Sequence, residues 1–459
     1  MRKLSLLTIA FVLGLLTQLD AQPYKVIYVF GSHPGDPADL GFVTTISQSP
    51  GGYLLGSSPF TEPDVTRGIA FEMSTGGGFK SLHTFTGLDG ASPVGGLILA
   101  TDQRFHGTTQ FGGQFDLGTV FRLSPDGKVT VEHSFAGGSD GEYPQSAPIQ
   151  STGGHFYGVT AGQFSPTNGA TNGTIYRISK AGEYSVLHAF SGSDGAHPFG
   201  PLLQGNDGQF YGTTLEGGSH NLGTIFRVGA DGKFKVLYNF DGTHGSEPFG
   251  PLIQASDGRF YGSTASGGGP ADAGVIFKIS PAGSLTVLHT FSGDDGRRPV
   301  GGLVQASDGN FYGTSQLGGL EGFGTLYRLT LAGTFTKLHD FVGQTGANPE
   351  GTLLQHTNGR LYGYTFRGGI DGIMYEYDLG LSPFVTWLPV YGRVGAKVVI
   401  LGQDFENNSI VSFNGVSATD VKIHPTYLKA IVPDGATTGD INVTTTSGTF
   451  KSNKVFVVH

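Results

Sequence analysis

Short runs that mix β-branched, aromatic and polar residues recur along the chain about every fifty residues. One clear copy holds four such runs: GPLLQ at 200–204, QFYGTT at 209–214, GTIFRV at 223–228 and KVLYNF at 235–240. Runs of this length and composition favour β-strands. The Asp207-Gly208 pair between the first two runs permits the positive φ angles of a tight hairpin. No helical period appears within the repeats, so the pattern predicts an all-β fold.

Seven copies of this unit follow one another along the chain, and the glycine of the FYG motif marks each of them. These glycines are Gly56, Gly107, Gly158, Gly212, Gly262, Gly313 and Gly363. We number the repeats 1 to 7 in this order. A period near fifty residues lies in the range of β-propeller blades.

The fourth run is missing from repeat 7, while a lone copy of it, KVIYVFG at 25–31, stands near the N-terminus. A closed ring explains this displacement, because an N-terminal strand beside 372–378 would complete the last sheet and leave no open edge. The sequence therefore predicts a seven-bladed β-propeller over 22–380 with four antiparallel strands per blade. The N-terminal strand would be outermost and GPLLQ innermost. A β-solenoid is the alternative, but it would leave the displaced strand unexplained.

The repeat consensus, G-x-L-x-Q-x-x-D-G-x-F-Y-G-T-T followed by G-G and G-T-I-F, resembles the GloVer tandem repeat of exported bacterial proteins. The resemblance covers roughly four fifths of the chain. It is weakest in repeat 1, where Leu55 replaces the tyrosine, and in repeat 3, where SPTNGATNG at 165–173 lengthens a loop. The resemblance implies export and repeats, and it implies no particular activity.

The pattern changes after Gly380. Apolar residues alternate with polar ones at Val398 and Ile400, at Val411 and Phe413, and at Ile441 and Val443. This alternation over six or seven short runs predicts a small two-sheet sandwich at 381–459. The VILGQDF, FNG and VPDGATTGDI segments resemble the IPT/TIG group of immunoglobulin-like domains, which implies an interaction or spacer module.

The first 21 residues have the pattern of a secretory signal peptide. Arg2 and Lys3 precede a mostly apolar run to Leu16, and Ala21 is a small residue before a cut. A buried N-terminal helix is the alternative. No later stretch is long and apolar enough to span a membrane. We therefore expect a secreted or periplasmic bacterial protein.

Amino-acid composition and net charge exclude several classes of protein. Gly accounts for 78 of the 459 residues, only 14% are charged, 12% are aromatic and Cys is absent. Frequent aromatic residues exclude a disordered chain, and the lack of Cys excludes disulfides and thiolate metal sites. The net charge of −9, without a basic run, argues against nucleic-acid binding.

Candidate ligand contacts lie on the long loops, which propellers commonly use for binding. Acidic residues that recur there are Asp89, Asp140, Asp194, Asp294 and Asp295. Such carboxylates could hold a cation or sugar hydroxyls, but an Asp before Gly also simply forms a turn, and no loop has calcium-site spacing. Residues peculiar to single repeats are candidates because a unique site needs broken symmetry. They are Glu142, Tyr143, His197, His220, His244, Glu247, Arg297, Arg298, Phe366 and Arg367.

Histidines also recur in the fourth runs, at His83, His133, His188, His289 and His339. Packed sheets lie about 10 Å apart, whereas zinc–nitrogen bonds are about 2 Å, so these side chains should pack between blades. We predict no metal or cofactor site. No catalytic motif is evident, since the G-x-S-x-G match at 137–141 lacks a strand-to-helix elbow.

These patterns favour an exported, monomeric, non-catalytic protein. Its long-loop face would contact an extracellular polysaccharide or protein, with the C-terminal domain as spacer or second contact. Two alternatives stay open: a carbohydrate-active hydrolase or lyase with a site at the channel mouth, and a purely structural envelope component.

Overall fold

The structure is a computed structural model that describes residues 23–33, 35–39, 45–61, 67–163, 171–388 and 391–458. The predicted signal peptide at 1–21 lies outside the described residues. Within them, the protein is built almost entirely of β-strands, as predicted. No helix among these residues is both long and apolar enough to cross a bilayer.

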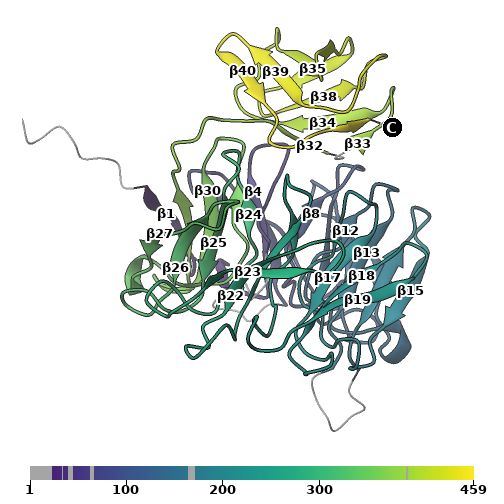
Figure 1. The fold of residues 1–459 in the computed structure, drawn as a ribbon. Helices are drawn as coiled ribbons and strands as arrows, with labels where there is room; N and C mark the ends of the chain where they lie inside the picture. Colours follow the sequence, from purple (N-terminus) through teal and green to yellow (C-terminus); the bar gives the residue numbers. More distant parts are fainter. Residues whose placement is uncertain are drawn as a thin grey trace, which may run out of the picture.

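Seven sheets of one design make up the repeat region that the structure describes (Figure 1). The first strands are β3 (Ser47–Gln48), β8 (Leu97–Leu99), β12 (Ile149–Gln150), β16 (Leu203–Gln204), β20 (Ile253–Gln254), β24 (Val304–Gln305) and β29 (Leu354–Gln355). The second strands are β4 (Leu54–Ser58), β9 (Phe105–Thr109), β13 (Phe156–Thr160), β17 (Phe210–Thr214), β21 (Phe260–Thr264), β25 (Phe311–Ser315) and β30 (Leu361–Arg367). The third strands are β6 (Ile69–Met73), β10 (Thr119–Leu123), β14 (Thr174–Ile178), β18 (Thr224–Val228), β22 (Val275–Ile279), β26 (Thr325–Leu329) and β31 (Ile373–Tyr377).

The fourth strands complete these sheets at the edge opposite the first strands. They are β7 (Phe79–Thr84), β11 (Val129–Ser134), β15 (Tyr184–Ala189), β19 (Phe234–Asn239), β23 (Leu285–Thr290), β27 (Phe335–Asp340) and β1 (Tyr24–Val29). Additional short elements are β2 (Pro37–Asp39), β5 (Phe60–Thr61), β28 (Ala347–Pro349) and the 3-10 turns η2 (Gly138–Asp140) and η3 (Gly343–Thr345).

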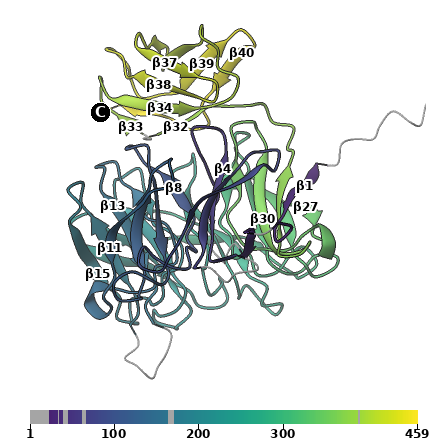
Figure 2. The ribbon, with the colours of Figure 1, turned by 180° about the vertical axis from the view of Figure 1, so that it is seen from behind.

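The N-terminal strand β1 supplies the fourth strand of repeat 7. It pairs antiparallel with β31, so that Tyr24 lies opposite Tyr377 and Val29 opposite Ile373. Figure 2 shows β1 beside β27 and β30, two strands that lie about three hundred residues further along the chain. The pairing of 25–30 with 372–378 that the sequence predicts is thereby confirmed, and the chain ends of the repeat region are joined by a β-ladder.

Neighbouring sheets pack face to face through aromatic and aliphatic side chains. The second strands are buried, apart from the last two residues of β30, whereas the fourth strands are mostly half-exposed. Tyr261 of repeat 5, for example, lies with its ring 4.3 Å from that of Phe311 in repeat 6. A cluster of the same kind joins Leu54 of repeat 1 to Tyr362 of repeat 7. Burial of apolar area at these junctions, at about 25 cal/mol per Å², is the main force that holds the sheets together.

A directional contact adds to this packing. The last residue of most first strands is a glutamine, and its side-chain oxygen accepts the backbone N–H of a hairpin residue in the preceding repeat. The links run from Thr101 to Gln150, Thr152 to Gln204, Asn206 to Gln254, Ser256 to Gln305, Ser307 to Gln355 and Thr357 to Gln48, at 2.8 to 3.3 Å. The last of these links joins repeat 7 to repeat 1.

Glycines allow the first strands of neighbouring repeats to approach closely. A Cβ atom on Gly250 would lie 3.0 Å from the backbone of Gly301, and one on Gly301 would lie 2.7 Å from the backbone of Gly351. The second distance is too short for a side chain and the first is tight, so glycine at these positions lets the backbones of consecutive repeats lie close together.

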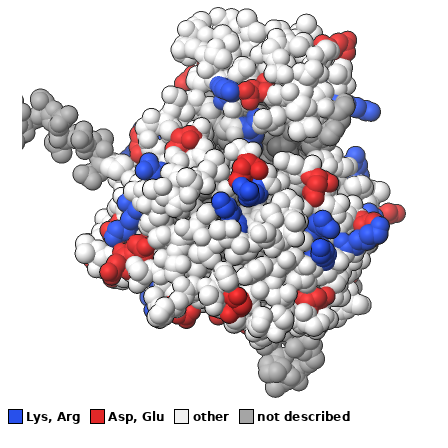
Figure 3. All heavy atoms as spheres, viewed as in Figure 1, with Lys and Arg blue, Asp and Glu red and all other residues white. Residues whose placement is uncertain are grey.

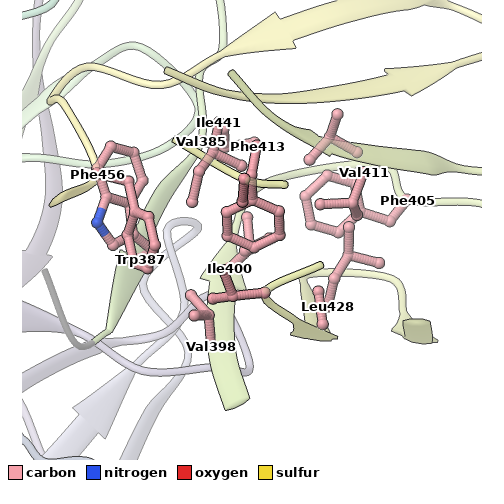
Figure 4. Packing of buried hydrophobic residues seen from close by; sticks show 14 residues of the cluster. Val385, Trp387, Val398, Ile400, Phe405, Val411, Phe413, Leu428, Ile441 and Phe456 are labelled. Carbon is pink, nitrogen blue, oxygen red and sulfur yellow. The ribbon is translucent and has the colours of Figure 1, made fainter. Parts of the chain in front are cut away.

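Two further sheets form the C-terminal part. The strands of one sheet are β32 (Thr386–Leu388), β34 (Lys397–Leu401), β38 (Tyr427–Ile431) and β37 (Val421–His424), in this order. Those of the other are β36 (Val416–Ser417), β35 (Ile410–Phe413), β39 (Ile441–Thr445) and β40 (Gly448–Lys451). A parallel pair, β33 (Tyr391–Gly392) and β41 (Val457–Val458), flanks them. Figure 4 shows their shared core, in which the predicted residues Val398, Ile400, Val411, Phe413, Ile441 and Val443 are all buried.

This C-terminal unit contacts the hairpins between first and second strands. Thr426 donates its hydroxyl to the Pro50 carbonyl at 2.7 Å, and Lys429 donates to the Gln103 side chain at 2.6 Å. The Gln403 amide donates to the Thr357 hydroxyl at 2.8 Å. These contacts fall on repeats 1, 2 and 7. Because antiparallel strands alternate in direction, the long loops leave the sheets at the other end.

His356 lies at the junction of repeats 7 and 1. Its Nε2 donates to the Gly52 carbonyl at 3.1 Å, and its Nδ1 accepts the N–H of Asn358 at 3.2 Å. The neutral ring satisfies both bonds, and protonation of Nδ1 would break the second. Burial lowers the pKa of His356 to about 4 from its ordinary value of 6.5.

We predict that His356 makes the fold sensitive to acid. The unfolded chain takes up a proton below about pH 6.5, and the folded chain does so only near pH 4, so stability falls as the pH drops through this window. The loss should reach roughly 2–3 kcal/mol. H356A installs the residue that Ala255 and Ala306 provide in repeats 5 and 6. Urea unfolding at pH 7.5 and 4.5 should show that acid lowers the free energy of unfolding less in H356A than in the wild type. Equal decreases in the two proteins would contradict this role.

Candidate functional site

In repeats 2 to 7, the long loops place one residue of each repeat in the same unusual backbone conformation. Six non-glycine residues, each directly before a proline, have φ between 56° and 59°: Ser92, Tyr143, His197, Glu247, Arg298 and Asn348. Each lies fifteen positions before the FYG glycine of its repeat, or before the equivalent glycine. Residues other than glycine rarely adopt this left-handed backbone region. Strain of this kind is typical of functional positions.

Backbone hydrogen bonds impose this conformation. The N–H of His197 donates to the Asn172 carbonyl at 2.9 Å, and its carbonyl accepts the N–H of Leu215 at 3.0 Å. Glu247 makes the equivalent pair of bonds with Leu222 and Ala265, at 3.1 and 2.9 Å. Both partners belong to the backbone, so these hydrogen bonds do not depend on the side chain that the position carries.

The side chains at these six positions, in contrast, all differ. The Tyr143 ring meets Phe111 edge to face at 5.5 Å. His197 is buried, with Nδ1 2.8 Å from the Ala161 carbonyl. Glu247 is half-buried and accepts the Ser266 hydroxyl at 3.3 Å, while Arg298 is exposed. The structure thus brings four of the predicted contact residues, Tyr143, His197, Glu247 and Arg298, to equivalent positions on one face.

The recurrent acids have a structural use. Asp89, Asp140, Asp194 and Asp295 pair with a histidine of the preceding fourth strand at 2.8 to 3.0 Å. Each also accepts a backbone N–H of its own loop, at 2.8 Å. Partial burial raises the pKa of Asp89, but the bonds from Thr86 and His83 outweigh it, so the pKa lies below its usual value. These carboxylates are separated by repeat and already hydrogen-bonded.

The histidines of these pairs stack on the next repeat. His133 lies 3.6 Å from the Tyr184 ring, His188 lies 3.8 Å from Phe234, and His289 lies 3.7 Å from Phe335, all nearly parallel. These contacts agree with the expected packing between blades. Across the described residues, no group of three or more His, Asp or Glu side chains is placed to hold one metal ion.

The remaining predicted residues do not gather at one point. Glu142 is buried and accepts the Thr171 hydroxyl. His244 is exposed and pairs with Asp241 at 2.8 Å. The Arg367 guanidinium lies 5.6 Å from the half-buried Phe366 ring. The other candidates, His220, Asp294 and Arg297, are exposed in repeats 4 and 6.

The repeat pattern matches a known family model over most of the chain. The Gloeobacter/Verrucomicrobia repeat model matches residues 41–269 and 230–387, about three quarters of the sequence together. The chain belongs to the Gloeobacter/Verrucomicrobia repeat family. The resemblance to GloVer tandem repeats is thereby confirmed. No curated protein matches this chain.

Solved structures resemble this Gloeobacter/Verrucomicrobia repeat protein in fold alone. A fungal alcohol oxidase of the AA5 family, in complex with copper, is 13% identical with a TM-score of 0.54. The likeness covers 92% of this chain and 98% of that one. A gluconolactonase of Xanthomonas campestris is 13% identical over 77% of this chain and 99% of its own, with a TM-score of 0.41.

An aromatic pair on the long-loop face was missed by sequence reasoning. Phe199 and Phe249 lie two residues after His197 and Glu247 in consecutive Gloeobacter/Verrucomicrobia repeats. Their rings are 4.8 Å apart and tilted by 42°, and both are half-exposed. The phenylalanine recurs in the sequence, in HPFGPL at 197–202 and in EPFGPL at 247–252. Only the assembled sheets, however, bring the two rings together.

A buried histidine in repeat 2 was also missed. His106 stands where most Gloeobacter/Verrucomicrobia repeats have tyrosine, and it lies 3.2 Å from both Asp102 and Glu132. Its ring stacks on Phe156 at 4.1 Å. Burial lowers the pKa of His106, but the two carboxylates outweigh it and raise the pKa above its ordinary value. The letters RFHGTT in place of FYGTT were the available signal.

We predict that the strained positions tolerate only certain residue types. Arg298 is exposed, so its replacement removes little packing. R298N should keep the stability within about 0.5 kcal/mol, because asparagine adopts the left-handed region readily. R298V should lose about 1–2 kcal/mol, because a β-branched residue fits this region poorly. Urea unfolding at neutral pH measures both, and equal stability of the two variants would contradict a left-handed backbone at this position.

Proposed function

We propose that the seven repeated sheets close into a seven-bladed β-propeller. The ladder between β1 and β31 supports this, as does the link from Thr357 to Gln48 between the last and first repeats. A single hydrophobic cluster that holds both Leu54 and Tyr362 supports it as well. Closure removes the exposed edges that an open array of sheets would present.

We propose further that 381–459 is an immunoglobulin-like module of the IPT/TIG type, and that 1–21 directs export. Two four-stranded sheets around one core support the first assignment, with Trp387 and Phe413 among the buried residues. The basic start and apolar run of the first residues support the second. The mature protein would then act outside the cytoplasm.

In this proposal the protein is a non-catalytic binding protein whose long-loop face contacts an extracellular polysaccharide or protein. One observation carries it: a single backbone conformation recurs with six different side chains, and three of these, Tyr143, Glu247 and Arg298, are at least partly exposed. A rigid frame with variable side chains is how binding surfaces combine stability with specificity. The Phe199–Phe249 pair would add an aromatic surface suited to the apolar face of a sugar.

The charges on the protein surface suit a partner that is neutral or that carries charges of both signs. The surface in Figure 3 carries small groups of both signs within a mostly uncharged area. A surface of this kind would favour hydrogen bonding and stacking over long-range electrostatic attraction.

The test is binding by the mature chain to a glycan array and to extracellular protein fractions at micromolar concentration. The triple variant Y143N/E247N/R298N keeps residues that tolerate positive φ, so it should fold and yet lose at least tenfold in affinity. A matched control, D231N/K233Q, changes exposed charges on a hairpin at the opposite end of the strands and should bind as the wild type does. Silence of the wild type in both assays, or unchanged binding by the triple variant, would reject the proposal.

A further inference from the structure

One junction between neighbouring repeats lacks the glutamine link. Between repeats 1 and 2, the donor position is Pro50, which has no N–H, and the acceptor position is Leu99. Both partners of the polar link are therefore replaced by apolar residues at the same junction. Because both partners are replaced, neither half of the link is left without its partner at this junction.

A cavity of about 300 Å³ lies at this junction, between repeats 1 and 2 and the C-terminal sheets. Pro50 and Tyr53 line it from repeat 1, Leu99 and Phe105 from repeat 2, and Leu388 and Tyr427 from the C-terminal part. Several lining residues are exposed, including Tyr53 (41%), Thr101 and Gln103, so the cavity is open to solvent along these hairpins, whereas Phe105 is only 4% exposed.

The size and walls of the cavity set the chemistry of what it can hold. An apolar cavity of roughly 150 Å³ accepts one benzene ring, so twice that volume accepts a molecule of about two rings. Tyrosine, phenylalanine, leucine and proline walls favour apolar and aromatic surface.

The two charged side chains of the lining, Lys429 and Glu72, each have a polar partner, but only Glu72 has a charged one. Lys429 donates to Gln103 at 2.6 Å and lies over the Tyr427 ring at 5.6 Å. Glu72 accepts Lys80 at 3.0 Å. An anionic ligand would have to displace Gln103 from Lys429 to use that charge, and a cationic ligand would have to displace Lys80 from Glu72. A neutral ligand leaves both contacts in place, which avoids this cost in free energy.

We propose that this cavity is a binding site for a small, neutral, largely aromatic ligand of about two rings. The site is formed where the repeat symmetry is broken, and the C-terminal unit supplies one of its walls. It is separate from the long-loop face, since its residues lie at the hairpin end of the repeats and in the C-terminal unit. It therefore does not depend on the function proposed for that face.

The probe for this test is 7-methoxycoumarin, a neutral molecule with two fused rings. Trp387 is the only tryptophan of the chain and precedes Leu388 on β32, so energy transfer from Trp387 to the probe reports occupancy. Isothermal titration calorimetry gives the affinity independently. We expect saturable one-site binding to the full mature protein. The carboxylate analogue, 7-methoxycoumarin-4-acetic acid, should bind at least tenfold more weakly.

Two variants locate the probe. P50T/L99Q rebuilds the link that Thr101 and Gln150 form at the next junction, and it should weaken binding at least tenfold. L99M keeps an apolar side chain of similar volume and should bind within threefold of the wild type. V399F fills the cavity from the C-terminal wall, which keeps the test decisive if P50T/L99Q does not fold. Absence of saturable binding, or unchanged binding by the folded filled variants, would overturn the site, and tighter binding of the carboxylate would overturn its neutral character.

Discussion

The architecture depends on one polar contact between neighbouring sheets, the bond from a hairpin N–H to a glutamine side chain in the next repeat. Apolar packing between the sheets supplies most of the free energy, but such packing is non-directional. At six of the seven junctions, a hydrogen bond at the hairpin tip fixes how one sheet is placed against the next. The same bond joins Thr357 to Gln48, so the contact that spaces consecutive repeats also connects the last repeat to the first.

Both candidate sites arise where this regular frame permits variation. On the long-loop face, backbone bonds hold the chain, and the side chains at residues such as His197 and Glu247 can differ without altering the loop. On the hairpin face, Pro50 and Leu99 remove one link, and the C-terminal unit covers the junction that they leave. Symmetry provides stability, and each departure from symmetry provides a surface found nowhere else on the molecule.

The strands, the pairing of β1 with β31 and the C-terminal core at Val398 and Ile400 were predictable, because each follows from local pattern and from counting the runs. The left-handed loop positions were not, because the side chains there share nothing except the proline that follows. The candidate acids such as Asp194 matched a binding pattern, yet histidine and backbone bonds occupy them. The Phe199–Phe249 pair and the junction cavity needed segments that only the assembled sheets bring together.

Hydrogen exchange of the linked hairpin amides tests the central claim most directly. Thr152, Asn206, Ser256 and Ser307 lie in exposed hairpins, where unbonded amides would exchange rapidly. In the mature protein, these amides should exchange slowly, and that of Thr357, which is also buried, should exchange at least as slowly. Slow exchange at the first four with rapid exchange at Thr357 would mean that the last repeat is not held against the first, and rapid exchange at all five would contradict the glutamine links altogether.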